Sequence, residues 1–102
     1  MYYYIYILYS EASDLFNVGY TKNVTVRFQQ HNETSRDSFT AKHRPWILKA
    51  IFQVGKNEAQ AIALEKFIKN QKSRKLIERL IDPDFLPTGK LAQLVRVPHV
   101  RD

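Results

Sequence analysis

The chain has 102 residues, of which 44% are hydrophobic and 13% aromatic, and its formal net charge is +6. This composition is typical of one globular domain and excludes a disordered chain. The absence of cysteine excludes disulfides, thiolate metal ligands and a cysteine nucleophile. The apolar opening MYYYIYILY lacks a basic flank and a cleavage motif and is too short to span a bilayer. We therefore expect a cytoplasmic protein without a membrane segment.

The basic charge lies in the middle of the chain. Residues 1–21 carry a net charge of −2, residues 22–49 and 50–81 carry +4 each, and residues 82–102 are neutral. A nucleic-acid-binding protein needs a basic surface of this kind, but a solvated basic face without a partner has the same composition. Charge alone therefore leaves both alternatives open.

Three segments have the pattern of β-strands. Residues 2–9 are almost continuously aromatic and β-branched, which predicts a strand buried on both faces. The polar stretch 10–14 has the length of a hairpin connection, and residues 15–20 resume the strand pattern, so these two strands should pair antiparallel. Residues 46–54 alternate and predict a third, half-buried strand. One face of this third strand would carry Trp46, Leu48, Ala50, Phe52 and Val54.

The segment after the second strand is ambiguous. Val24, Val26 and Phe28 alternate as in a strand, and β-branched residues favour that reading. Val24, Phe28 and two polar residues, Arg27 and His31, also have the spacing of one helical face. We predict a helix.

Two further helices have clearer signals. Residues 57–71 form an amphipathic pattern that Asn57 can cap, and this is the strongest helix prediction in the chain. Ser73 can cap a shorter helix that ends before Asp82-Pro83. For the helix after the second strand, both Thr21 and Asn23 are candidate caps.

The remaining segments lack periodicity. Residues 32–45 are polar and basic and predict a long surface loop. From residue 83 onward no period survives, so we expect a folded domain over residues 1–82 and a weakly specified tail over residues 83–102. Residues 91–97 could lie extended against the domain.

The stretch from Leu15 to His31 has the features of a phosphate site. Its strand ends at Gly19, where the lack of a side chain lets another chain or a ligand approach the backbone. Arg27 and His31 are four residues apart and would share one face of the following helix. Two such side chains beside an open backbone suit a phosphate group.

Several short motifs in this order resemble a known family. They are Tyr4-Ile5-Tyr6 in the first strand, Asn17-Val18-Gly19 in the second, Arg27 with His31 in the next helix, and Glu65 in the long helix. Together they resemble the GIY-YIG nuclease domain, in particular its small stand-alone branch, which is related to the N-terminal domain of an excision-repair nuclease.

The resemblance covers residues 2–81 and implies both fold and activity. The implied fold is α+β, a small three-stranded antiparallel sheet flanked by helices. The implied activity is that of a metal-dependent endonuclease, which hydrolyses phosphodiester bonds in DNA with one Mg²⁺ or Mn²⁺ ion. Because nothing in the chain resembles a base-reading module, we expect the enzyme to prefer a DNA structure rather than a sequence, in repair or recombination.

The resemblance also implies roles for individual residues. Tyr6 would act as the base or position the water, Arg27 would contact the scissile phosphate, and Glu65 would bind the metal. His31 could orient Tyr6, relay its proton or contact phosphate, since imidazole titrates near neutrality. Asn17 departs from the family, which usually has a tyrosine there, and an amide cannot ionise as a phenol can.

Each of these residues also has a plain structural alternative. Tyr6 could be one aromatic of a buried strand, Arg27 a solvated helix residue, and His31 a capping or surface residue. Glu65 could form an i,i+4 ion pair with Lys69.

Six basic residues are candidate contacts to the DNA backbone, although each alone could simply be solvated. They are Lys22, Lys42, Arg44, Lys69, Lys72 and Arg74. A catalytically impaired nucleic-acid-binding module is the main alternative function, because Asn17 could mark a loss of chemistry. A protein-interaction domain is a weaker one, and a homodimer or a protein partner could complete the substrate-binding surface.

Overall fold

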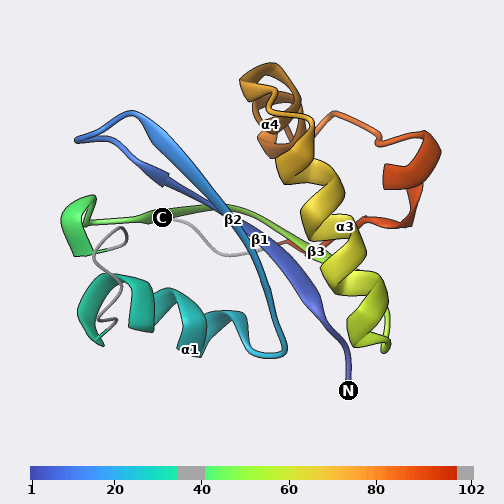
Figure 1. Ribbon diagram of the computed structural model, residues 1–102, viewed down its shortest axis with the longest axis horizontal. Coiled ribbons are helices and arrows are strands. Elements are labelled where there is room, and N and C mark those ends of the chain that lie inside the picture. Colours follow the sequence, from blue (N-terminus) through green and yellow to red (C-terminus); the bar gives the residue numbers. More distant parts are fainter. Residues whose placement is uncertain (35–40, 99–102) are drawn as a thin grey trace.

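A four-stranded antiparallel sheet is the centre of the computed structural model, which describes residues 1–34 and 41–98 (Figure 1). The strands are β1 (Tyr4–Ser10), β2 (Leu15–Thr21), β3 (Ile47–Gln53) and β4 (Val95–Arg96), in the order β2-β1-β3-β4. The α+β class and the three predicted strands are confirmed. The sheet has one more strand than the sequence predicted, because two residues of the C-terminal segment pair with β3.

Helices cover both faces of the sheet. Figure 1 shows α1 (Val24–Gln29) on one side and α3 (Glu58–Asn70) with α4 (Arg74–Ile81) on the other. The chain continues beyond α1 as a π-helix, η1 (Gln30–Thr34), and the C-terminal segment contains a short 3₁₀-helix, η2 (Gly89–Gln93). Within residues 1–34 and 41–98, no helix has the length and apolar character needed to cross a membrane.

The helix starts agree with the capping residues in the sequence. Asn57 accepts a hydrogen bond from the backbone N–H of Gln60, and Ser73 caps α4 in the same way. Between the two candidates for α1, Asn23 is the cap, and it accepts from the N–H of Val26 at 3.1 Å. These bonds satisfy N–H groups that have no partner inside a helix, which is why each helix begins where it does.

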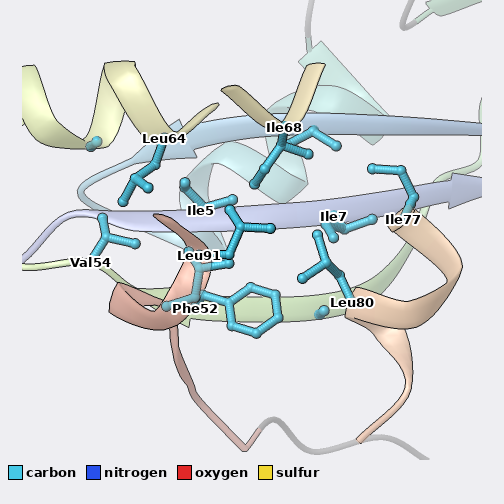
Figure 2. Packing of buried hydrophobic residues seen from close by; sticks show 13 residues of the cluster. Ile5, Ile7, Phe52, Val54, Leu64, Ile68, Ile77, Leu80 and Leu91 are labelled. Atoms are coloured by element: carbon cyan, nitrogen blue, oxygen red, sulfur yellow. The ribbon is translucent and has the colours of Figure 1, made fainter. Parts of the chain in front are cut away.

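The main hydrophobic core lies between the sheet and the pair α3 and α4 (Figure 2). Side chains from β1, β3, both helices and η2 meet there, and those drawn with labels in the figure are Ile5, Ile7, Phe52, Val54, Leu64, Ile68, Ile77, Leu80 and Leu91. A smaller cluster under α1 contains Tyr6, Leu8 and Trp46. The strand β1 is therefore buried on both faces, as its continuous apolar pattern predicted.

A bulge in β3 changes which residues share a face. Ile7 pairs with Ala50 and Leu8 with Leu48, so one residue of β3 has no opposite partner. The predicted single apolar face of residues 46–54 is therefore wrong. The extra residue reverses the alternation of side chains along the strand. Trp46 and Leu48, from the start of the predicted face, join the cluster under α1. The rest of that face, Ala50, Phe52 and Val54, packs in the main core.

Part of the C-terminal segment packs on the domain. Leu91 and Leu94 are buried in the main core, and Val95 and Arg96 form β4. Arg96 donates hydrogen bonds to the carbonyl oxygens of Leu80 and Asp82 at 2.8 and 2.9 Å. Residues 91–97 were expected to lie extended against the domain, and they do pack on it, but only Val95 and Arg96 form a strand, because residues 89–93 form η2.

Candidate active site

The site begins with Tyr6 of β1 and Gly19 of β2, which lie opposite each other in the sheet. Tyr6 is only 3% exposed, and a Cβ added at Gly19 would overlap its hydroxyl oxygen. The ring of Tyr6 therefore passes over the bare backbone of Gly19, and its hydroxyl lies over the edge strand of the sheet. The sequence predicted that another chain or a ligand would approach the backbone at Gly19, whereas the group that approaches in the structure is a tyrosine of the same chain.

Two side chains converge on the Tyr6 hydroxyl. Nε2 of His31 lies 2.9 Å from the hydroxyl oxygen, and Nε of Arg27 donates to that oxygen at 3.4 Å. Arg27 belongs to α1 and His31 to η1, so the predicted convergence of these two residues is present in the structure. Arg27 is exposed, and it also donates through Nη1 to Gln30 at 3.3 Å. Its guanidinium thus joins the buried hydroxyl to the protein surface.

The backbone around His31 is tied to the residues that precede β3. The side chain of Asn32 accepts from the backbone N–H of Trp46 at 2.5 Å and donates to the Trp46 carbonyl at 3.0 Å. Arg44 donates through Nε to the carbonyl oxygen of His31 at 2.6 Å. These three bonds explain how His31, which is 6% exposed, keeps its position against Tyr6. No pattern in the sequence indicated the role of Asn32, since its partner lies 14 residues away.

The electrostatic surroundings keep Tyr6 protonated at neutral pH. Burial raises the pKa of Tyr6 above its ordinary value of 10.0, the hydrogen bond and charge of Arg27 lower it in part, and the charge of Glu65 raises it. Because Arg27 donates to the phenol oxygen, the Tyr6 O–H can donate to Nε2 of His31. The hydroxyl is therefore linked to a nitrogen base in the resting protein.

Glu65 lies on α3 at the border of the main core. Its side chain is 15% exposed, and one carboxylate oxygen lies 3.3 Å from Nζ of Lys69. The ion pair that the i,i+4 spacing allowed is thus present. The charge of Glu65 still acts on Tyr6 and on Tyr20, whose pKa is raised first by a hydrogen bond to Glu58.

The residues present fit a lightly held divalent ion. No group of three or more His, Cys, Asp or Glu side chains in the described part of the chain could form a metal cage. Mg²⁺ does not need such a cage, because it is often held by one carboxylate, several waters and the phosphate of the substrate. Glu65 is a suitable carboxylate for that arrangement.

Asn17 lies on the same face of the sheet as Tyr6 and Gly19. It pairs with Leu8, two positions from the pairing of Gly19 with Tyr6, and it is half-buried. Because β2 is the edge strand, Asn17 also lines a groove of about 360 Å³ at this edge of the sheet, together with Lys69 of α3. The unusual residue is therefore a neighbour of the candidate site.

Two of the predicted DNA-binding residues make hydrogen bonds within the protein, and one of them also forms ion pairs. Arg74 pairs with Asp14 at 2.5 Å and with Glu78 at 3.1 Å, and it donates to the Asp14 carbonyl at 3.0 Å. Arg44 donates to the backbone of His31. Both arginines make bonds within the folded protein, which a count of charges along the sequence could not show, and their contact with DNA stays a prediction.

The four predicted lysines lie in different surroundings. Lys22 and Lys42 are exposed, Lys69 pairs with Glu65, and Lys72 lines the groove beside Asn17. Lys22 also lines a hollow that contains Arg27.

Comparison with known proteins identifies a family through a family model. No curated protein matches the chain. The family model of the GIY-YIG catalytic domain matches residues 2–78, which is most of the chain and includes Tyr6, Gly19, Arg27 and Glu65. The chain therefore belongs to the GIY-YIG family of nuclease domains.

Proposed function

We propose that this protein is an endonuclease that uses one Mg²⁺ or Mn²⁺ ion to hydrolyse phosphodiester bonds in DNA. Membership of the GIY-YIG family implies nuclease activity in general and dependence on a divalent metal. The observation that supports this particular site is the Tyr6 hydroxyl, held by His31 and Arg27 above the backbone of Gly19.

In the proposed reaction, Tyr6 and His31 move a proton. A water molecule attacks phosphorus while the Tyr6 oxygen accepts a proton from that water. The phenol proton passes at the same time to Nε2 of His31, and the bond between phosphorus and the leaving oxygen breaks. The raised pKa of Tyr6 makes a free phenolate scarce at neutral pH, so this transfer to a neighbouring base has a clear role.

Arg27 would bind the phosphate. Its guanidinium is planar and permanently charged, and Nε and Nη1 account for its hydrogen bonds to Tyr6 and Gln30. The exposed remainder of the group can donate to phosphate oxygens, where negative charge increases during attack.

Glu65 would hold the metal ion. When bound, the ion supplies positive charge that stabilises the pentavalent phosphate and the leaving oxygen. In the free protein, Lys69 forms an ion pair with the Glu65 carboxylate. We propose that it contacts the DNA backbone in the complex.

The proposed substrate is branched, flapped or nicked DNA. Lys22, Lys42 and Lys72 are exposed and can contact phosphates, and such contacts position a duplex without reading its sequence. A role in repair or recombination follows from this substrate class. Three expectations stay predictions. They are the cytoplasmic location, the homodimer or protein partner, and the closer likeness to the excision-repair branch.

Asn17 favours one alternative function. If the usual tyrosine is essential for chemistry, the protein would bind nucleic acid without cutting it. Asn17 lies on the face of the sheet that carries Tyr6, so its effect on the site would be direct.

A cleavage assay tests the proposal. Purified protein is incubated with flapped, branched, nicked and plain duplex DNA, with Mg²⁺, with Mn²⁺ and with a chelator. The variants Arg27→Ala and Glu65→Gln should lower the cleavage rate by at least about 100-fold. Arg79→Ala and Glu11→Gln are matched controls, because both residues are exposed and lie outside the site. Salt-sensitive binding without cleavage of any DNA would contradict the nuclease and support the alternative.

A further inference from the structure

A second feature adjoins the candidate active site. A hollow of about 490 Å³ lies where β2 ends and α1 begins, and Arg27 forms part of its wall. Its other walls include Tyr3, Tyr20, Lys22 and Glu58. In Figure 1 the end of β2, the start of α1 and the start of β1 lie at the same end of the sheet. A ligand that contacts Arg27 can therefore also enter the hollow.

Two aromatic rings give the hollow a surface for stacking. The centroids of Tyr3 and Tyr20 are 6.3 Å apart, with an angle of 46° between the ring planes. Both residues are half-buried, and the ammonium of Lys22 lies 5.8 Å from the centre of the Tyr3 ring. A lysine end is flexible, so a flat ligand can displace it from that face. Aromatic surfaces of this kind bind nucleobases in proteins that take up single-stranded nucleic acid.

The charged groups that line the hollow come from different elements. Tyr20 donates its hydroxyl proton to Oε2 of Glu58 at 3.0 Å, which fixes the orientation of its ring. A carboxylate accepts hydrogen bonds from base amino groups and repels phosphate. The cations Lys22 and Arg27 lie at the connection from β2 to α1 and in α1, whereas Glu58 begins α3, and all three are exposed. This separation of charge suits a nucleotide whose base approaches Glu58 and whose phosphate approaches the two cations.

We propose that the hollow receives an unpaired nucleotide next to the scissile phosphate. Its base stacks on the ring of Tyr3 and lies beside Tyr20, and its phosphate lies between Lys22 and Arg27. The inference rests on the proposed function, because Arg27 marks the place of cleavage. A base inside a duplex has both faces covered by its neighbours, whereas an unpaired base can leave the stack. The preferred DNA is then one that carries a flap or a gap.

Binding without metal tests this inference separately from cleavage. Two nicked duplexes carry the same one-nucleotide flap, except that one flap is abasic. The wild type should bind the flap that has a base about tenfold more tightly. Tyr3→Leu should abolish this preference, and Tyr3→Phe, which keeps the ring, should preserve it.

A fluorescent base provides a readout that needs no variant. 2-Aminopurine in the flap should lose fluorescence when the wild type binds, because stacking quenches it, and at a paired position it should change little. Equal binding of the two flaps, or unquenched 2-aminopurine, would overturn the inference. If the protein cuts DNA with metal but shows no preference for the flap that has a base, the proposed binding of a base in the hollow is contradicted and the proposed nuclease activity is not. A clear preference without cutting would contradict the nuclease alone.

Discussion

At the scale of single residues, Tyr6 and Gly19 depend on each other. The Tyr6 ring occupies the space that any side chain at position 19 would need. The same packing brings the hydroxyl to His31 and Arg27. The glycine of the second motif is thus explained by the tyrosine of the first.

The Gly19→Ala variant tests this dependence. The added methyl group would displace the Tyr6 hydroxyl, and a displacement of about 1 Å can lower a rate by about 100-fold. We expect the cleavage rate to fall by about 100-fold, as measured by timed cleavage of flapped DNA. We also expect a modest fall in the thermal unfolding temperature. Ala12→Ser, at an exposed position of the hairpin, is the control. A Gly19→Ala protein with the wild-type cleavage rate would refute the dependence.

Asn17 allows a test in the opposite direction. Asn17→Tyr should raise the cleavage rate if the missing phenol limits the reaction, because the new hydroxyl would lie on the face of Tyr6. Asn17→Phe adds the ring without the hydroxyl and separates packing from chemistry. Rates are compared on one flapped duplex with Mg²⁺. An unchanged or lower rate in Asn17→Tyr would mean that this position does not limit the reaction.

The sequence indicated some candidate site residues and not others. Short motifs indicated Tyr6, Arg27, His31 and Glu65, and the structure brings His31 and Arg27 to the Tyr6 hydroxyl. Asn32 was not found, because its role depends on a contact with distant backbone that no spacing reveals.

Charge alone could not separate the basic residues. Arg44 and Arg74, both predicted DNA contacts, make hydrogen bonds to backbone carbonyls within the protein. A sequence does not show which basic side chains make hydrogen bonds within the protein.

At the scale of elements, the helices were predicted well because periodicity and caps agree. Asn57 and Ser73 cap the helices that the apolar spacing indicates. The bulge in β3 was missed, since one extra residue changes the register without changing the composition. The middle of the predicted loop over residues 32–45 lies outside the described residues.

The C-terminal segment offers a test of what belongs to the folded unit. Leu91 is 6% exposed in the main core, so Leu91→Ala should lower the free energy of unfolding by about 2–5 kcal/mol. Val95 is 58% exposed, and Val95→Ala should change the free energy of unfolding by less than about 0.5 kcal/mol. Urea unfolding measures both. Equal stability of Leu91→Ala and wild type would show that residues beyond 82 add nothing to the core, in agreement with the predicted domain boundary.

At the scale of the whole molecule, the two faces of the sheet have different tasks. The face under α3 and α4 carries the larger core, and the face under α1 carries Tyr6 and its partners. Because Tyr6 belongs to a hydrophobic cluster, its ionisation should affect the stability of the whole fold.

The pH dependence of stability follows from the direction of the Tyr6 pKa. Its folded-state pKa is raised above 10.0, so above that pH the folded state binds more protons than the unfolded state. The contribution of Tyr6 is therefore complete below about pH 10 and is lost as the pH rises through the folded-state pKa. Urea unfolding of wild type and Tyr6→Phe from neutral pH to about pH 11 should show a steeper loss for the wild type. Parallel curves would contradict the assignment.

The most direct test of the central claim removes one oxygen atom. Tyr6→Phe keeps the buried ring and deletes the hydroxyl that joins His31 and Arg27. Tyr9→Phe is the matched control, because Tyr9 is on the same strand and its hydroxyl bonds Asp14, away from the site. We predict that metal-dependent cleavage of flapped DNA falls by at least about 100-fold in Tyr6→Phe and stays near the wild-type rate in Tyr9→Phe. A Tyr6→Phe protein that cuts as fast as the wild type would contradict the account.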